Sequence, residues 1–237
     1  MARQIGRDSG SMKIEAFVVL FLAQVTGYLI GGIPFAYIVT WLKTGKDIRA
    51  IGSGNVGATN VGRLLGLPYF FLVFFLDFAK GAGPVLLAQY LARNTSLPGA
   101  EFLPPVVGFT AILGHLFPIY LGMKGGKGVA TAIGVLLCLT PWATLVGLAT
   151  WIVLTLASRM VSFGSVGFAA AFAIAHLLIT GEPWSRDQLP LSILVLLLAV
   201  LIVVKHRSNI SRILAGTEPK LSFGSKSKGS EPAEHVS

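Results

Sequence analysis

The chain has 237 residues, of which 54% are hydrophobic and 12% are charged, and its mean hydropathy is +0.75. Soluble domains usually carry about twice that charged fraction, so the composition excludes an ordinary soluble enzyme. Several apolar runs approach or exceed the ~20 residues that a helix needs to cross a bilayer, whereas a membrane β-barrel would show alternating segments of ~10 residues. We therefore expect an all-α polytopic membrane protein.

The formal net charge is +9. In a soluble protein this charge would suggest nucleic-acid binding, but here most of it falls in short loops between apolar runs. Such loops orient a chain in the membrane and attract anionic ligands, so we expect no nucleic-acid partner. The acidic residues are scattered, which predicts no metal site, and we expect no cofactor. Cys138 lies in an apolar run and is expected to be buried as a small hydrophobe.

The first part of the chain is a polar stretch, 1–13, which predicts a disordered tail. The apolar run that follows, 16–42, is too long for the core of a cleavable signal peptide and predicts a span. It contains Gly31, Gly32 and Pro34, which favour a kink or a close helix contact. The remaining predicted spans follow between polar loops: 67–92, 104–121, two short helices within 129–157, 165–180 and 189–204.

Pro141 decides the number of spans. Because proline ends or kinks a helix at the residue before it, we interpret 129–157 as two helices, which gives seven transmembrane helices. One kinked helix would give six. With seven, most Lys and Arg residues lie on the side of the C-terminus, so the positive-inside rule predicts the N-terminus outside and the C-terminus cytoplasmic. We expect one membrane-embedded catalytic domain over 14–220 and a disordered cytoplasmic tail over 221–237.

The first polar loop carries the pattern Gly-Ser-Gly-Asn-x-Gly-Ala-Thr-Asn-x-x-Arg at 52–63. Its glycines allow close approach of the backbone to a ligand, and its arginine can bind phosphate through two N–H groups. Helix capping explains one Ser or Asn in such a loop but not several together. We expect a phosphorylated ligand to contact Ser53, Asn55, Thr59, Asn60 and Arg63.

A second loop, Gly-Met-Lys-Gly-Gly-Lys-Gly-Val-Ala-Thr at 122–131, separates two strongly apolar segments. Backbone N–H groups of glycines at the start of a helix form an anion site, and lysine adds a full charge. A flexible basic loop that only sets the topology is the alternative. The residues expected to bind phosphate here are Lys124, Gly125, Gly126, Lys127 and Thr131.

Ionisable residues inside predicted spans indicate function by default. Asp77 and Lys80 lie three residues apart and share a helical face, so they could form a structural ion pair or reach the site. His115 stands near the cytoplasmic end of its span, nine residues before Lys124, and is a candidate for proton handling or binding. We interpret His176, which lies mid-span without polar neighbours, as structural.

Two further groups of polar residues are expected on the same side of the membrane. His206 and Asn209 share a face of a helix after the last span, where a basic tail beside lipid headgroups is the alternative. Ser162 and Ser165 follow Arg159 in a short loop at 158–164, and their hydroxyls suit either an anion or a helix cap.

Several familiar chemistries lack their motifs. The sequence contains no Gly-x-Ser-x-Gly elbow. The His/Asp dyad of the common glycerolipid acyltransferases, the histidine/arginine pattern of lipid phosphatases and the aspartate array of CDP-alcohol phosphotransferases are missing as well. A transporter of a phosphorylated metabolite is the chief rival, but it would line the bilayer midplane with charge. A membrane scaffold without chemistry gives no reason for two glycine-rich basic loops on one side.

The motifs together resemble those of the bacterial acyl-phosphate:glycerol-3-phosphate acyltransferases. They come in the order found in that family and cover about 40–220: the 52–63 pattern, Asp-x-x-Lys-Gly at 77–81, Gly-His-x-x-Pro at 114–118, Lys-Gly-Gly-Lys-Gly-Val-Ala-Thr at 124–131, and the tail patterns at 206–212 and 216–218. The resemblance implies a seven-helix enzyme of the bacterial cytoplasmic (inner) membrane, with its active site facing the cytoplasm. It would transfer a fatty acyl group from acyl phosphate to the 1-hydroxyl of glycerol 3-phosphate, giving lysophosphatidic acid and phosphate in the first acylation of phospholipid synthesis.

The resemblance also implies partners and residue roles. The partners would be the two substrates, the lipid bilayer and the soluble enzyme that forms acyl phosphate; neither acyl-CoA nor acyl carrier protein would be needed. Either a general base such as His115 or the phosphate of the donor would take the proton, and a covalent acyl-enzyme on Ser53 is a further alternative. The expected catalytic residues are Ser53, Arg63, His115 and Lys124, and the expected substrate-binding residues are Asn55, Thr59, Asn60, Lys80, Gly125, Gly126, Lys127, Thr131, Ser162, Ser165, His206 and Asn209.

Overall fold

The computed structural model describes the backbone of residues 2–96 and 98–221, and side chains from Ile14 onward. Every regular element in these ranges is a helix. In chain order they are α1 (Ala2–Gly32), α2 (Phe35–Thr44), η1 (Ile48–Ala50), α3 (Ala58–Leu65), α4 (Leu67–Arg93), η2 (Ala100–Phe102), α5 (Leu103–Leu116), η3 (Ile119–Leu121), α6 (Val129–Leu139), α7 (Pro141–Ser158), α8 (Val161–Ile179), α9 (Leu189–Lys205) and α10 (Arg207–Leu214).

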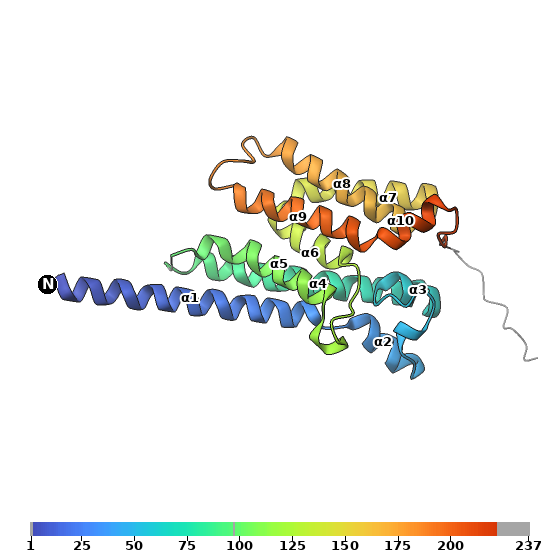
Figure 1. Cartoon of the computed structure of the whole chain (residues 1–237), viewed down its shortest axis with the longest axis horizontal. Coiled ribbons are helices and arrows are strands. Elements are labelled where there is room, and N and C mark those ends of the chain that lie inside the picture. Colours follow the sequence, from blue (N-terminus) through green and yellow to red (C-terminus); the bar gives the residue numbers. More distant parts are fainter. Residues whose placement is uncertain (1, 97, 222–237) are drawn as a thin grey trace, which may run out of the picture.

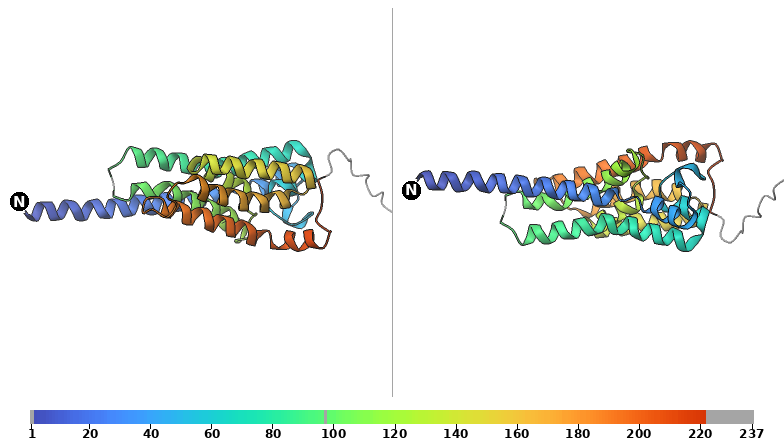
Figure 2. Two further views of the ribbon diagram at one scale, coloured as in Figure 1. Left: turned by 90° about the horizontal axis from the view of Figure 1, so that it is seen from above. Right: turned by 90° about the horizontal axis from the view of Figure 1, so that it is seen from below.

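The long helices lie side by side along one axis and form an elongated bundle (Figure 1). The N-terminal part of α1 extends beyond the bundle at one end, and both views of Figure 2, each at right angles to Figure 1, show the same extension. The short helices α2, α3 and α10 gather at the other end, together with the last described residues (Figure 1). The two ends of the described chain are therefore at opposite ends of the bundle.

Five helical segments of the described chain are long and apolar enough to cross a membrane: Ile14–Thr44, Leu67–Arg93, Ala100–Leu121, Pro141–Ser158 and Val161–Ile179. A sixth is counted if α9 and α10, which are bent by 55° relative to each other, form one span. The expected division at Pro141 is confirmed, because α6 ends at Leu139 and α7 begins at Pro141. However, α6 has 11 residues, or about 16 Å at 1.5 Å per residue, which is well short of a bilayer core. The all-helical membrane architecture is confirmed, with five or six candidate spans.

Several element boundaries differ from those expected. The backbone is helical from Ala2, where a disordered tail over 1–13 was expected, and no proline precedes Pro34 to interrupt it. The expected break near Pro34 is confirmed, because this ring fixes φ and lacks an N–H. The expected loop at 158–164 is shorter, since α8 already begins at Val161. Apart from Leu221, the tail expected over 221–237 lies outside the described residues.

Helices α1 and α5 touch through glycines. A Cβ on Gly31 would overlap the carbonyl oxygen of Ala111, and a Cβ on Gly114 would overlap that of Tyr28. Gly27 and Gly31 form a Gly-x-x-x-Gly pair on α1, which lets two backbones approach closely where lipid supplies no hydrophobic driving force. The close contact expected near Gly31 is therefore present.

Helix α6 is held against α4 in the same way. A Cβ on Gly134 would overlap the carbonyl oxygen of Phe78, and one on Gly81 would overlap that of Thr131. On its other sides α6 faces a core of buried side chains from α5, α8 and α9, including Leu116, Phe168 and Leu198. This packing fixes the first turn of α6, and with it the glycine-rich loop before α6, at the end of the bundle where α2, α3 and α10 gather.

We expect Gly31→Leu to destabilise the folded protein, because its side chain has no space between α1 and α5 and overpacking of this kind costs ~1–3 kcal/mol or more. Gly83→Ala is the matched control: nothing lies within 4 Å of a Cβ at this position, so its melting temperature should stay within about 2 °C of wild type. Thermal melting in detergent tests both variants. Equal melting temperatures for Gly31→Leu and wild type would contradict the close α1–α5 contact.

Candidate active site

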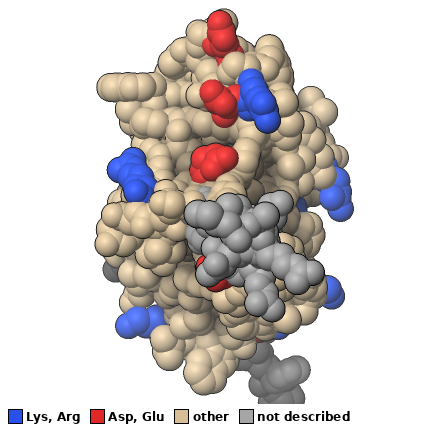
Figure 3. Space-filling view, turned by 90° about the vertical axis from the view of Figure 1, so that its left-hand side faces the viewer, with Lys and Arg blue, Asp and Glu red and all other residues tan. Residues whose placement is uncertain are grey.

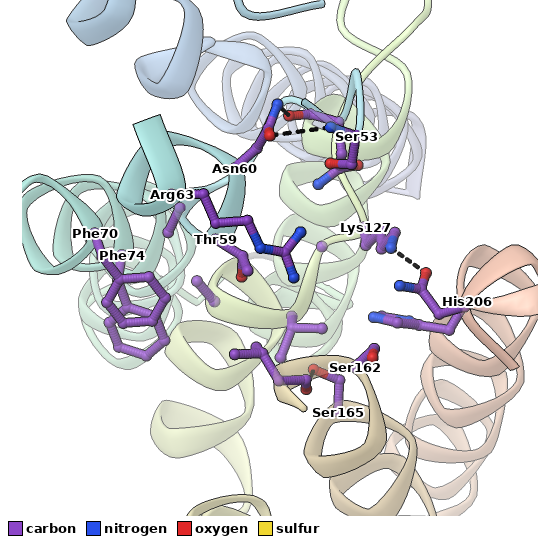
Figure 4. A pocket seen from close by; sticks show the side chains of 18 of the residues that line it. Ser53, Thr59, Asn60, Arg63, Phe70, Phe74, Lys127, Ser162, Ser165 and His206 are labelled. Carbon is purple, nitrogen blue, oxygen red and sulfur yellow. Dashed lines mark hydrogen bonds between the residues drawn. The ribbon is translucent and has the colours of Figure 1, made fainter. Parts of the chain in front are cut away.

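A cavity of about 420 Å³ lies at the end of the bundle where the short helices gather (Figure 4). Its walls come from the loop before α3 and from α3 itself, from the first half of α4, the end of α5, the loop before α6 and the first turns of α6 and α8, and from α7, α10 and the segment after α10. The polar and charged lining residues are Ser53, Asn55, Thr59, Asn60, Arg63, Asp77, His115, Lys127, Ser162, Ser165, His206, Asn209, Arg212 and Glu218.

Most of the residues expected from sequence meet in this cavity. The first polar loop contributes Ser53, Asn55, Thr59, Asn60 and Arg63, and the other loops and helices contribute His115, Lys127, Ser162, Ser165, His206 and Asn209. Both basic loops therefore line the same cavity, as expected. Arg63 of the first loop also contacts Pro219, which lies 156 residues further along the chain.

Five expected residues do not line the cavity. Lys124 is exposed and does not line the cavity, so its assignment as a catalytic residue stays a prediction without support from this geometry. Of the two lysines in this loop, Lys127 lines the cavity and Lys124 does not. Lys80 is buried in an ion pair, Gly125 and Gly126 line a separate cavity of about 10 Å³, and Thr131 is buried against His115.

Asn60 shapes the loop before α3. Its side-chain Nδ2 donates to the carbonyl oxygens of Ile51 (2.9 Å) and Asn55 (3.2 Å), and its Oδ1 accepts from the backbone N–H of Ser53 (3.2 Å). Gly52 adopts a left-handed φ of 59°, which suits glycine, and a Cβ there would meet Oδ1 of Asn60. Asn60 is 2% exposed, so its amide holds the loop in shape around the cavity.

The carboxylate of Glu218 connects several side chains in one wall of the cavity. Its Oε1 accepts hydrogen bonds from Ser162 Oγ (2.6 Å) and Asn209 Nδ2 (2.6 Å), and its Oε2 accepts one from Arg212 Nε (2.8 Å). Burial acts to raise the pKa of Glu218, but the hydrogen bonds from Ser162, Asn209 and Arg212 outweigh it, so the pKa lies below its usual value. The residue is therefore an anion that joins α8, α10 and the segment after α10.

Lys127 extends this network into the cavity. Its Nζ contacts Oδ1 of Asn209, the amide whose nitrogen donates to Glu218 (Figure 4). Burial lowers the pKa of Lys127 to about 8; Glu218 opposes this shift, whereas Arg212 and Arg63 add to it. The charged form of a lysine that is both buried and close to arginines is stabilised when an anion enters, because the anion interacts favourably with its charge.

The side chain of Arg63 extends into the cavity from α3 (Figure 4). Its Nη2 donates to the carbonyl oxygen of Pro219 at 3.2 Å, which ties α3 to the segment after α10. On the facing wall, Nδ1 of His206 lies 2.8 Å from the carbonyl oxygen of Ile202. Since a carbonyl only accepts, this contact places the proton on Nδ1 and leaves Nε2 of His206 as an acceptor.

The opposite side of the cavity is apolar. Phe70 and Phe74 of α4 lie across from His206 (Figure 4). The ring of Phe74 stacks on Trp151 of α7 with a centroid separation of 6.3 Å, and Nε1 of Trp151 donates to Ser165 Oγ at 3.3 Å. The cavity therefore has a cationic, polar side next to an aromatic side.

Sequence reasoning missed Glu218, Arg212 and the aromatic wall as site residues. Glu218 did carry a signal, because it stands in the Gly-Thr-Glu pattern at 216–218 and is the single acidic residue between Lys205 and Lys228. Phe70, Phe74 and Trp151 carried none, since aromatic residues in apolar spans are common. Within the described residues, no group of three His, Cys, Asp or Glu side chains is placed to hold a metal ion.

These features define a polytopic helical membrane protein with a cavity at one end of its bundle, built for a ligand that is anionic on one side and apolar on the other. Comparison with known proteins agrees. Residues 21–216 match the family model described as glycerol-3-phosphate acyltransferase. The chain therefore belongs to the glycerol-3-phosphate acyltransferase family.

Individual relatives cover nearly the same region. A glycerol-3-phosphate acyltransferase of Anaeromyxobacter sp. (strain Fw109-5) is 43% identical over 195 residues, which span 82% of this chain and 93% of the relative. One from Brucella ovis is 40% identical over 203 residues, spanning 86% and 94%. The crystal structure of PlsY, an integral membrane glycerol 3-phosphate acyltransferase, in its glycerol 3-phosphate form has a TM-score of 0.76 and 36% identity, and covers 86% of this chain and 96% of its own. Its lysophosphatidic acid form has a TM-score of 0.73 and 34% identity.

We expect Glu218→Gln to lower the free energy of unfolding by about 2 kcal/mol, because it weakens charge-assisted hydrogen bonds at a buried position. The pKa of Glu218 is lowered on folding, so its contribution is present above the unfolded pKa and is lost as the pH falls through the folded pKa. Melting temperatures measured between about pH 3 and pH 7 should converge for wild type and variant at the acid end. Glu182→Gln, at an exposed position, is the control and should match wild type throughout.

Proposed function

We propose that this chain transfers a fatty acyl group from acyl phosphate to the 1-hydroxyl of glycerol 3-phosphate, with lysophosphatidic acid and phosphate as products. The observation that carries the proposal is the division of the cavity into a cationic side and an aromatic side. Both substrates carry phosphate, and one carries a long apolar chain, so this pair matches both sides. The known relatives are named for the acceptor, glycerol 3-phosphate.

We assign the two phosphates to different parts of the cationic side. The acyl phosphate would lie at the start of α6, where Val129 and Ala130 line the cavity in the first turn and Lys127 adds a charge. Glycerol 3-phosphate would lie between Arg63 and His206, with Asn209 as a further partner. Lys124, expected from sequence to hold glycerol 3-phosphate, has no part in this assignment because it lies outside the cavity.

The reaction needs charge stabilisation more than a strong base. The 1-hydroxyl oxygen attacks the acyl carbonyl carbon, a C–O bond forms, the bond to the phosphate oxygen breaks, and phosphate leaves with the electron pair. Lysine and arginine preorganised in a partly dry cavity stabilise the negative charge that develops on these oxygens. We propose that the phosphate itself takes the proton of the attacking hydroxyl. Ser53 lines the cavity, but it contacts Asn60 through its backbone N–H, so a role of its hydroxyl as nucleophile has no support.

The acyl chain would leave the cavity past Phe70, Phe74 and Trp151. These side chains line the cavity, and α4 and α7 are both candidate spans with exposed apolar side chains such as Phe75 and Val153. A chain placed there stays in an apolar environment while its phosphate end remains with Lys127. The same route would release lysophosphatidic acid sideways into the bilayer.

We propose a topology of seven crossings in the bacterial inner membrane, with α6 as a short one and with α2, α3 and α10 at the cytoplasmic surface. The support is the position of the described chain ends at opposite ends of the bundle (Figure 1), as an odd number of crossings requires. On the end of the bundle that bears the N-terminus, the described Lys and Arg side chains visible in Figure 3 are interspersed with Asp and Glu. Basic residues at the cavity end, such as Arg63, Lys127 and Arg212, support our proposal that this end faces the cytoplasm, where a soluble acyl-phosphate-forming enzyme could deliver the donor.

The rival function, transport of a phosphorylated metabolite, loses its main support. It would place charged residues along a path through the middle of the membrane. Here Asp77 and Lys80 neutralise each other at 2.7 Å, and their side chains are 4% and 3% exposed. The cavity lies at one end of the bundle, as suits a reaction at the membrane surface.

The direct test is an assay of purified protein with palmitoyl phosphate and glycerol 3-phosphate in detergent or lipid cubic phase. We expect release of phosphate that depends on glycerol 3-phosphate and matches the lysophosphatidic acid formed, and no product when palmitoyl-CoA replaces palmitoyl phosphate. Activity with palmitoyl-CoA alone would overturn the proposed donor, and no activity from folded protein with either donor would overturn the proposal.

Arg63→Ala and Lys127→Ala should each reduce kcat/KM by roughly tenfold or more, because each removes a charge-assisted contact with phosphate. Lys46→Ala removes an exposed lysine outside the cavity and serves as the matched control. Steady-state kinetics with both substrates measure the effects. Wild-type rates in either cavity variant would refute that residue's assignment.

The pH dependence should report Lys127. Its pKa of about 8 means that the free enzyme loses this charge as the pH rises through that value, so kcat/KM should fall above about pH 8. In Lys127→Arg the charge persists to much higher pH, because the guanidinium pKa exceeds ~12. We expect the alkaline fall to disappear in this variant even if its plateau is lower. The same fall in both enzymes would assign the titration to another group.

A further inference from the structure

A second polar cluster lies directly beside the active-site cavity, inside the bundle. Asp77 and Lys80 of α4 and His115 of α5 form it, and they are 2%, 5% and 6% exposed. The small cavity of about 10 Å³ that these three residues help to line also borders Gly125 and Gly126. The cluster thus stands between the helices and the glycine-rich loop that carries Lys127.

Lys80 fixes the cluster to the break between α1 and α2. Its Nζ lies 2.7 Å from Oδ1 of Asp77 and donates to the carbonyl oxygen of Ile33 at 2.7 Å. Ile33 precedes Pro34, where the chain leaves the helical conformation and its carbonyl oxygen becomes available to an outside donor. One ammonium group therefore holds α4 and the α1–α2 break together.

His115 fixes the cluster to the glycine-rich loop and to α6. Its Nδ1 lies 3.2 Å from Thr131 Oγ1 on α6 and 3.8 Å from Oδ1 of Asp77, and its backbone oxygen accepts from the N–H of Gly126 at 3.2 Å. The ring also packs against the loop, since a Cβ on Gly126 would overlap Nε2 of His115. The loop therefore rests on the backbone and on the ring of this one residue.

We infer that Asp77, Lys80 and His115 are positioning residues: they set the shape of the loop at 124–128 and the first turn of α6, and so the place of Lys127 in the cavity. The inference rests on the proposed function for the role of Lys127 in binding phosphate. His115 acts through the loop, because its Nδ1 is engaged by Thr131 and its Nε2 faces Gly126. It is therefore not the group that moves the proton of the reaction.

The ion pair also has an electrostatic task. Asp77 lines the phosphate cavity, where an unpaired carboxylate would repel both substrates and would be unfavourable to bury. Lys80 neutralises this carboxylate from the side away from the cavity. Removing the lysine alone should therefore harm both folding and substrate binding, whereas removing both charges together should harm them less.

The first test replaces His115 by Asn and by Ala, with hydrogen exchange of the peptide covering 122–128 measured by mass spectrometry alongside kinetics. The amide of Asn can take the place of Nδ1 beside Thr131 but cannot transfer protons as imidazole does. We expect His115→Ala to speed exchange in this peptide by at least tenfold and to raise KM for palmitoyl phosphate by a similar factor. His115→Asn should stay within about threefold of wild type in both, with an unchanged pH profile of kcat/KM.

One result would overturn the inference directly. If His115→Asn keeps wild-type protection of 122–128 but loses kcat by about a hundredfold, His115 takes part in proton transfer. Wild-type exchange of the peptide in His115→Ala would overturn it as well. The exchange data do not depend on the reaction, so an inactive wild-type enzyme with the expected exchange pattern would refute the proposed function and leave the inference standing.

The second test is a cycle of Lys80→Met, Asp77→Asn and the double variant. We expect Lys80→Met to melt at least 5 °C below wild type or to fail to fold, and to show faster exchange over 122–128 if it folds. The double variant should recover at least half of the loss in melting temperature. A Lys80→Met protein that matches wild type in melting and exchange, or a double variant worse than both single ones, would contradict the role of the ion pair.

Discussion

The structure depends on several positive charges that lie close together in a partly desolvated cavity. Lys127, Arg63 and Arg212 meet in one cavity, and burial together with the two arginines lowers the pKa of Lys127 to about 8. Glu218 offsets part of this positive charge, because it accepts three hydrogen bonds and its lowered pKa keeps it ionised. Under the proposed function, a substrate phosphate in the cavity would complete the charge compensation that this single carboxylate begins.

Close glycine contacts and helix breaks in the bundle determine the position of the helix ends that surround this cavity. Glycines on α1, α4, α5 and α6 bring backbones into contact, so the ends of the helices near the cavity have little freedom. The breaks at Pro34 and Pro141 produce helices of unequal length, and α6 starts at the cavity but stops part-way across the bundle. A membrane protein can leave helices broken in this way only where side chains or neighbouring helices satisfy the freed backbone groups, as Lys80 does for Ile33.

Sequence reasoning recovered the class, the two loops and most of the cavity, because these follow from local features. Apolar length predicts spans, proline predicts breaks, and glycine with lysine or arginine predicts a phosphate site. It failed where the answer depends on direction or on distant partners. Lys124 and Lys127 lie three residues apart in a loop without helical periodicity, so nothing local shows which one faces inward. For Lys80 the sequence left open an ion pair with Asp77 or a role at the substrate; the structure shows the ion pair and adds a hydrogen bond to a carbonyl oxygen 47 residues away.

The role of Glu218 likewise depends on contacts with residues that are distant in the sequence. Its partner Ser162 is 56 residues distant, and only the fold brings a segment after the last helix back across α8. The central claim is that the cavity cations near this carboxylate bind the substrate phosphates, with Arg63 on the acceptor. Isothermal titration of glycerol 3-phosphate into detergent-purified wild type and Arg63→Met at about pH 7 tests it most directly, with glycerol as the uncharged comparison. We predict binding of glycerol 3-phosphate but not of glycerol, and a dissociation constant at least tenfold higher in the variant. Equal dissociation constants in the two proteins, or equal binding of glycerol, would contradict the account.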